Sequence, residues 1–115
     1  MPVTATDIVQ DSSDMTFMAD VIEASHYIPV IVDFWAPWCK PCKPFWTRLE
    51  KAVRAAEGKI RLVRINTDEN PEIVSDFCVR GLPAIYTFKD GESVDGYYGE
   101  RPDTALNTLI AKLTA

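Results

Sequence analysis

The pattern of hydrophobic and polar positions along this chain switches between the period of a strand and the period of a helix. Short runs rich in β-branched and aromatic residues predict five strands. Stretches in which apolar residues recur every three or four positions predict four helices between and after them. These features give the order βαβαβαββα. The predicted strands cover residues 6–10, 29–35, 59–66, 84–88 and 93–98.

Capping residues mark the ends of the predicted helices. The segment Ser12–Asp14 offers N-cap side chains for a first helix that ends near Ser25. A long helix starts at Pro41 and is terminated by Gly58. The remaining boundaries are a cap at Asn70 followed by Pro71, a stop before Gly81, and a last helix with Leu106, Leu109, Ile110 and Leu113 on one face.

This order of elements predicts an α/β fold with a central mixed sheet between helices. Alternating strands and helices require right-handed parallel crossovers. The dipeptide Asp90-Gly91 suits a type I′ turn, so the last two strands form an antiparallel hairpin. There is no internal repeat and no Gly/Ser-rich linker, so we expect one domain over residues 1–115. In such sheets, sites collect beyond the carboxyl ends of the strands, and Cys39 follows the strand at 29–35.

Charge and cysteine content narrow the class of function. The formal net charge is −5 and no run of like charges occurs, which argues against nucleic acid or an anionic membrane as the main partner. The segment Met1–Asp14 has no Lys or Arg and no apolar run of secretory length, so we expect a cytoplasmic protein. In a reducing compartment, three cysteines indicate catalysis, redox sensing or metal binding rather than a structural disulfide framework.

Two cysteines and one aspartate carry the candidate chemistry. Cys39 lies where the long helix begins, and the helix dipole and unpaired backbone N–H groups there favour its thiolate, the form that attacks disulfides. Cys42, in the first turn, is shielded until Cys39 is locked in a mixed disulfide, which Cys42 then resolves. Asp33 interrupts an apolar strand, so burial should raise the pKa of its carboxyl group.

The segment Trp38-Cys39-Lys40-Pro41-Cys42 resembles the Trp-Cys-Gly-Pro-Cys motif of the thioredoxin family. Asp33 matches the acidic residue that the family places six positions before its first cysteine. Pro83, in Gly81-Leu82-Pro83, matches its cis-proline. Because the resemblance covers nearly the whole chain, it implies a thioredoxin fold and a protein-disulfide reductase.

The resemblance also implies roles for individual residues. Asp33 would serve as general base for Cys42 through water, unless it is a buried carboxyl held by hydrogen bonds. Lys40 and Pro41 are expected to tune the redox potential, Lys40 because an ammonium beside Cys39 favours its thiolate. The substrate-binding rim would consist of Trp38, Gly81, Leu82, Pro83 and Gly99, with a plain turn as the alternative for Gly81 and Pro83.

Cofactors and partners follow from the same resemblance. No bound cofactor is required beyond the redox-active disulfide Cys39–Cys42, and no metal. The implied partners are disulfide-containing client proteins and an NADPH-dependent thioredoxin reductase. We expect a monomer with no nucleic-acid or membrane partner.

Departures from the family pattern carry further expectations. Lys40 replaces the small glycine of the motif, and Thr47 stands where the family has a helix-kinking proline. Pro44 should remove the first hydrogen bond of a helix that starts at Pro41. Cys78 is expected to be a buried thiol at a helix end. The other expectations are charges on the rim at Glu100 and Arg101, a surface position for His26, packing for Trp46, and a solvated strand charge near Asp33 for Arg64.

Two other classes of function remain open on the sequence. A chaperone-like protein-binding module is one, because 17–25 and 94–98 look similar to thioredoxin domains that precede helical repeats in some stress chaperones. A zinc site formed by Cys39, Cys42, Cys78 and His26 is the other, although one Cys-x-x-Cys pair is only half of such a site.

Overall fold

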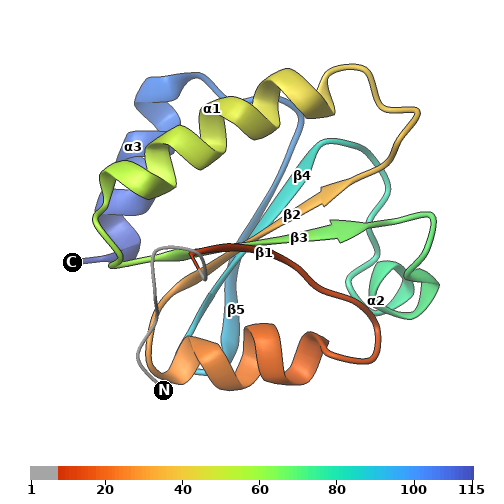
Figure 1. The fold of residues 1–115 in the computed structure, drawn as a ribbon, viewed down its shortest axis with the longest axis horizontal. Helices are drawn as coiled ribbons and strands as arrows, with labels where there is room; N and C mark the ends of the chain where they lie inside the picture. Colours follow the sequence, from red (N-terminus) through yellow and green to blue (C-terminus); the bar gives the residue numbers. More distant parts are fainter. Residues whose placement is uncertain (1–7) are drawn as a thin grey trace.

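The central sheet of the protein has five strands in the order β1-β3-β2-β4-β5. The structure, a computed structural model, describes residues 8–115 and is drawn in Figure 1. Strands β1, β3 and β2 run parallel to one another, β4 pairs antiparallel with β2, and β5 pairs antiparallel with β4. This confirms the predicted mixed sheet. The strands are β1 Val9–Asp11, β2 Val30–Trp35, β3 Arg61–Asn66, β4 Ala84–Lys89 and β5 Glu92–Tyr98.

Helices cover both faces of this sheet (Figure 1). Helices α1 (Cys42–Ala55) and α3 (Asp103–Leu113) pack on one face, over a core that includes Ile31, Phe45 and Leu106. The other face is covered by α2 (Pro71–Asp76) and by the helical segment that precedes β2. The predicted fold class and order of elements are therefore confirmed.

Strand β2 is the central strand of the sheet and leads directly to the cysteines. It pairs with β3 on one side and β4 on the other, and all but its last residue are buried. Val32 and Phe34 belong to the core beneath the first helical segment and α2, whereas Ile31 belongs to the core beneath α1 and α3. Because side chains alternate along a strand, Asp33 shares the face of Ile31 and lies on the α1 side.

The first helical segment differs from the predicted α-helix. It consists of a π-helix, Met18–Glu23, followed by a 3₁₀ turn, Ala24–His26, and no side chain caps its start. Asp14, predicted to cap this segment, instead accepts hydrogen bonds from the backbone N–H groups of Glu72 (3.2 Å) and Ile73 (2.9 Å). It thus caps α2 from 58 residues away in the sequence. The predicted first strand, 6–10, lies partly outside the described residues; its described part forms β1, which extends to Asp11.

The long helix α1 begins one residue later than predicted, and this removes the expected irregularity at Pro44. The first helical hydrogen bond runs from the N–H of Phe45 to the carbonyl of Pro41 (3.2 Å). Pro44 is the third helical residue, a position whose N–H has no partner within a helix. Its missing donor therefore costs no backbone bond. The predicted terminator, Gly58, does follow the helix and has a positive φ of 84°.

Cys78 is exposed, so the prediction of a buried thiol is wrong. The residue follows α2 with a φ of 52°, the left-handed position at which a helix commonly ends on glycine. Its N–H bonds to the carbonyl of Ser75, and the N–H of Val79 bonds to the carbonyl of Val74. This pair of bonds is the Schellman motif, which turns the Cys78 side chain outward.

Replacing Cys78 by glycine should therefore stabilise the protein. The left-handed conformation is unfavourable by about 1 kcal/mol for a residue with a Cβ atom, whereas glycine adopts it without this cost. We expect Cys78→Gly to raise the free energy of unfolding in urea by about 0.5–1 kcal/mol. Cys78→Ser keeps the Cβ and serves as the control, which should stay close to the wild type. Equal stabilities for all three proteins would contradict this reading of the helix end.

Candidate active site

Cys39 and Cys42 form a disulfide at the junction between β2 and α1, with their Cα atoms 5.4 Å apart. The loop from β2 places them there through two turns, in which the N–H of Cys39 bonds to the carbonyl of Ala36 and the N–H of Cys42 to the carbonyl of Cys39. Cys42 is 1% exposed and Cys39 is 5% exposed. The sulfur pair is therefore nearly covered, and Cys39 is the more accessible partner.

The start of α1 offers fewer backbone donors to Cys39 than the sequence suggested. Pro41 and Pro44 have no N–H, and the N–H of Cys42 bonds to the Cys39 carbonyl. Within the first turn, this leaves the N–H of Lys43 as the donor without a backbone partner in the described structure. The helix dipole still favours a thiolate at Cys39, since the first turn contains no acidic residue. The exposed ammonium of Lys40, the residue next to Cys39, is therefore a more important source of stabilisation for the Cys39 thiolate.

Removing the charge of Lys40 should make the protein a stronger reductant. An ammonium favours the thiolate of Cys39 and so stabilises the dithiol form relative to the disulfide. Because Lys40 is exposed, the effect should be about 0.3–1 kcal/mol, which corresponds to about 6–20 mV. We expect Lys40→Gln to lower the redox potential by this amount against a glutathione buffer at low ionic strength. The shift should shrink in high salt, and no shift at low salt would show that this charge does not tune the site.

Asp33 is a buried carboxyl group to which no described residue donates a hydrogen bond. It is 1% exposed, and neither of its oxygens has a partner among the described residues. Burial raises the pKa of Asp33 to about 8, while the positive charge of Arg64 acts in the opposite direction. Hydrogen bonds from the described residues therefore do not hold this carboxyl group. A carboxyl group that changes charge near neutral pH can exchange protons during a reaction.

Arg64 lies opposite Asp33 on β3, but other groups engage its guanidinium. One nitrogen donates to the Glu50 carboxylate at 2.5 Å, and the guanidinium carbon lies 3.9 Å from the centroid of the Trp46 ring. Trp46 in turn stacks on Trp35, with 5.0 Å between ring centroids. Arg64 is thus near Asp33, as expected, but it is largely buried rather than solvated. Because Glu50 and Trp46 hold Arg64, it supplies charge to Asp33 without a hydrogen bond.

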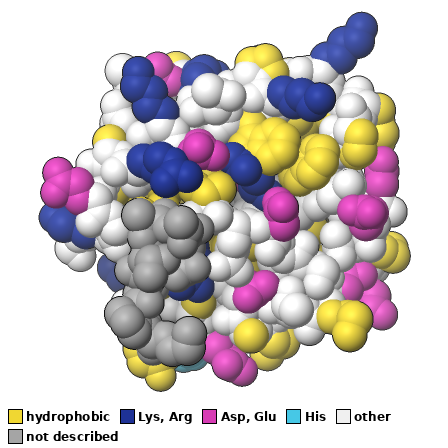
Figure 2. Space-filling view, viewed as in Figure 1, with side chains coloured by type: hydrophobic (Ala, Val, Ile, Leu, Met, Phe, Trp, Pro, Cys, Tyr) yellow, Lys and Arg dark blue, Asp and Glu magenta, His cyan; other side chains and the backbone are white. Residues whose placement is uncertain are grey.

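This arrangement lies beside the start of α1. Figure 2 shows hydrophobic side chains gathered between α1 and the ends of β2 and β3, bordered by Lys and Arg side chains. The aromatic pair Trp35 and Trp46 packs on the α1 side of the sheet, the same side as Asp33. Trp46 therefore has the packing role that the sequence predicted, and it also covers the guanidinium beside Asp33.

A shallow groove beside Cys39 brings together three of the predicted rim residues, Trp38, Gly81 and Leu82. Trp38 is 68% exposed, and its indole N–H donates to the carboxylate of Asp68 at 3.1 Å. Leu82 packs against the cluster formed by Ala36, Cys39 and Cys42. Trp38 and Leu82 thus link the groove to the sulfur pair.

Pro83 and Gly99 continue this rim. The Leu82–Pro83 peptide bond is cis, as the resemblance implied. The N–H of Gly99 donates to the carbonyl of Pro83 at 2.8 Å, and Gly99 has a φ of 81°, which favours glycine. The two segments are therefore side by side although 16 positions separate these residues in the sequence.

Sequence reasoning missed several residues that shape the groove and its surroundings. Asp68 and Arg80 lie far from the cysteines in the sequence, and only the docking of α2 beside Trp38 brings them near. Arg48, which reads as an ordinary polar position on α1, contacts the loop after Gly99. No local pattern in the sequence signals these contacts, because each joins elements that are distant along the chain.

The four residues of the hypothetical zinc site do not come together. Cys39 and Cys42 are bonded to each other, Cys78 is exposed at the end of α2, and exposed His26 lies beside Gly91 in the turn between β4 and β5. Residues 8–115 contain no group of three or more His, Cys, Asp or Glu side chains placed to bind a metal ion. Over the same residues, no helix has the length and apolar character needed to cross a membrane.

Comparison with known proteins agrees with this geometry. The sequence model of the family described as Thioredoxin matches residues 8–112. "Thioredoxin 1" of Nostoc sp. is 40% identical over 100 residues, which cover 87% of this chain and 92% of that protein. "Thioredoxin 1" of Synechococcus elongatus is 43% identical over 98 residues, covering 84% and 90%. "Thioredoxin M-type, chloroplastic" of Spinacia oleracea is 38% identical over 104 residues, covering 90% of this chain and 56% of that protein.

These similarities extend over most of the chain and include the segment with the Cys39–Cys42 disulfide. That disulfide is the redox-active pair of a protein-disulfide oxidoreductase. The chain belongs to the thioredoxin family.

Proposed function

We propose that the dithiol form reduces client protein disulfides, with Cys39 as nucleophile and Cys42 as resolving thiol. The thiolate of Cys39 attacks one sulfur of the client disulfide, and the other client sulfur leaves as a thiolate. Cys42 then attacks the Cys39 sulfur, which releases the second client sulfur. Two electrons pass to the client, and the Cys39–Cys42 disulfide forms. The greater exposure of Cys39 supports this order of attack.

We assign to Asp33 the proton that Cys42 must lose before it attacks. The observation that carries this assignment is that the Asp33 carboxyl group, on β2, is buried on the side of the sheet covered by α1 and has no partner among the described residues, and α1 begins at Cys42. With its pKa raised to about 8, about a tenth of Asp33 is ionised at pH 7, and that fraction rises with pH. A water molecule between the carboxylate and the thiol would carry the proton.

The groove at Trp38, Gly81 and Leu82 is the proposed binding surface for the client. Its position beside Cys39 would let an extended client segment lie along Leu82–Pro83 and present its disulfide to the thiolate. Gly99 adds the neighbouring backbone to this surface through its hydrogen bond to Pro83. The apolar contact area and the adjacent backbone supply affinity without a fixed sequence preference.

The proposed electron donor is an NADPH-dependent thioredoxin reductase, and the proposed compartment is the cytoplasm. An exposed free thiol at Cys78 suits a reducing compartment, in which it would stay reduced. We propose that the protein acts as a monomer and needs no bound cofactor, because the dithiol itself carries the two electrons. Disulfide-containing proteins are its clients.

The chaperone-like alternative gains no support from the structure. Phe17 and Val21 of the segment 17–25 are buried and pack in the core against β2 and β4. Their apolar surface is therefore used for folding. The second segment, 94–98, belongs to β5, and its residues 95–98 pair with β4.

Turnover with NADPH and a thioredoxin reductase tests the proposal. With oxidised insulin as client, NADPH oxidation should continue at a rate proportional to the concentration of this protein. Omission of the protein or of the reductase should stop the reaction. Efficient reduction by glutathione together with no NADPH consumption by an active reductase would contradict the proposed donor.

A further inference from the structure

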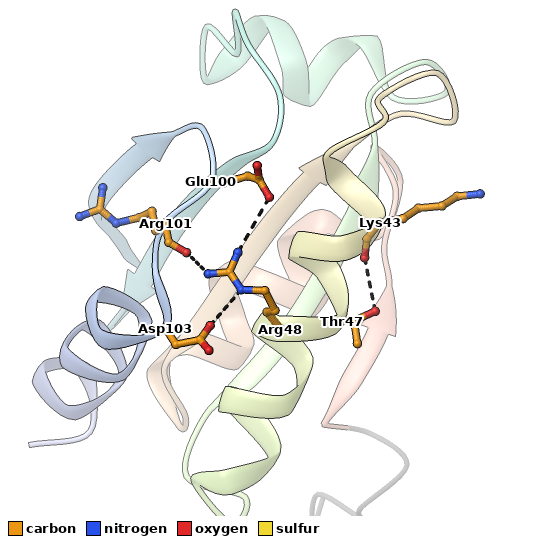
Figure 3. A network of polar contacts seen from close by, with 6 residues as sticks. All are labelled: Lys43, Thr47, Arg48, Glu100, Arg101 and Asp103. Atoms are coloured by element: carbon orange, nitrogen blue, oxygen red, sulfur yellow. Dashed lines mark hydrogen bonds and ion pairs between the residues drawn. The ribbon is translucent and has the colours of Figure 1, made fainter.

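Arg48 joins the active-site helix to a loop that follows β5. It lies on α1, six residues after Cys42, and its side chain reaches the segment 100–103 (Figure 3). Its Nε donates to the Asp103 carboxylate at 2.9 Å, and one Nη donates to the backbone carbonyl of Arg101. The other Nη lies 3.9 Å from the Glu100 carboxylate. All three guanidinium nitrogens are therefore directed at one short loop.

The loop held by Arg48 is continuous with the rim of the groove. Gly99 immediately precedes Glu100, and its N–H donates to the carbonyl of Pro83, while Leu82 packs against the cluster that contains Cys39 and Cys42. An unbroken series of contacts thus runs from α1 through the loop 99–103 to the cis-proline segment. The loop thus connects α1 with the cis-proline segment, and both of these carry parts of the site.

No other ion pair of α1 in the described part of the chain reaches this loop. Glu50 pairs with Arg54 on the same helix and with Arg64 on β3. The Lys43 side chain points away from the loop in Figure 3. The three acceptors of the loop lie around the planar, fork-shaped guanidinium group of Arg48. A lysine ammonium could not satisfy all three equally well.

We propose that Arg48 is a positioning residue for protein substrates, which holds the loop 99–103 so that a client meets a preformed rim. The inference rests on the proposed function. A folded client contacts the rim on both sides of its disulfide. If the loop were disordered, binding would have to order it, and this would cost free energy. A small disulfide needs only Cys39. Loss of Arg48 should therefore slow reduction of proteins and spare reduction of small molecules.

Single-turnover kinetics of the prereduced protein separate these two effects, in a Cys78→Ser background that removes the exposed third thiol. The client is insulin, and the small substrate is 2,2′-dithiodipyridine, which carries no charge at neutral pH. We expect Arg48→Ala to lower the second-order rate constant for insulin by about threefold to tenfold and to change that for dithiodipyridine by less than about twofold. Arg48→Lys should fall between wild type and Arg48→Ala, because an ammonium replaces only part of the fork.

Arg54→Ala is the matched control. It removes the same charge from the same helix, but within residues 8–115 Arg54 forms an ion pair only with Glu50 and none with the loop. It should leave both rate constants unchanged. Urea unfolding of each variant checks that the comparison concerns folded protein.

Three results would overturn the inference. Arg48→Ala could reduce insulin as fast as the wild type, it could slow both substrates equally, or Arg54→Ala could reproduce its effect. A wild-type protein that reduces the small disulfide but not insulin would instead refute the proposed function itself, and with it the positioning role of Arg48. The two failures are therefore distinguishable.

Discussion

A Cys42→Ser variant should accumulate as a mixed disulfide between Cys39 and a protein client. Without the second thiol, the first attack still occurs, but no intramolecular attack releases the client. Catalytic turnover should fall to background, because each molecule stops after its first attack. The experiment belongs in a Cys78→Ser background, since Cys78 is an exposed thiol that would form disulfides of its own. Non-reducing electrophoresis and mass spectrometry of the adduct would identify the bonded cysteine.

The matched variant Cys39→Ser in the same background tests the assignment of roles. Cys42 is 1% exposed and lies in the first turn of α1, so it should not attack a folded client. No adduct should accumulate. Adducts on Cys42 in the Cys39→Ser protein, with none on Cys39 in the Cys42→Ser protein, would reverse the two roles.

Asp33→Asn should stabilise the oxidised protein by about 2–4 kcal/mol at pH 7. Burial raises the pKa of Asp33 from 3.8 to about 8, so the folded state keeps its proton over a range in which the unfolded chain has lost it. The wild-type free energy of unfolding therefore falls as the pH rises from about 4 to about 8, by about 1.4 kcal/mol per pH unit, and levels off above that range. Asparagine has no proton to lose and escapes this penalty.

Urea unfolding at several pH values measures this difference directly. The stabilities of wild type and Asp33→Asn should converge near pH 4 and diverge towards pH 8. The control is Asp76→Asn, which removes an exposed carboxylate on α2 in place of the buried one. A difference between Asp33→Asn and wild type that does not change with pH would mean that the carboxyl group does not titrate in this range.

The same Asp33→Asn variant should reduce clients more slowly than the wild type, although it is more stable. If the carboxylate takes the proton of Cys42, reduction of a client by wild type should accelerate between pH 6 and pH 8, as the ionised fraction of Asp33 grows. Asparagine cannot accept that proton, so the acceleration should be lost and the rate near pH 7 should fall. An unchanged rate profile would remove Asp33 from the mechanism while leaving its effect on stability intact.

The architecture and the reactive residues were predictable because each depends on short-range patterns. Strand β2 is a continuous apolar run apart from Asp33, which identified both a central strand and an unusual carboxyl group. The Cys39–Cys42 spacing and the Asp90-Gly91 turn likewise occupy a few adjacent residues. In the structure, Asp90 and Gly91 have positive φ angles of 55° and 83°, as a type I′ turn requires.

The features that the sequence did not predict depend on contacts between distant segments. Asp14 resembled a local N-cap, but its carboxylate caps α2, because the docking of that helix offers it two free N–H groups. Cys78 resembled a buried thiol by residue type, but the geometry of a helix end turned it to solvent. Arg64 was expected to be a solvated charge, but Glu50 and Trp46, on a neighbouring helix, cover its guanidinium group.

The central claim is that the dithiol transfers its electrons to a protein disulfide, and a stoichiometric reaction tests it most directly. Fully reduced protein is mixed with oxidised insulin, quenched in acid, alkylated and mapped by mass spectrometry. We expect equal amounts of lost insulin disulfide and newly formed Cys39–Cys42 disulfide, with Cys78 still a free thiol. Insulin that is bound but not reduced, or reduction that consumes Cys78 in place of the Cys39–Cys42 pair, would contradict it.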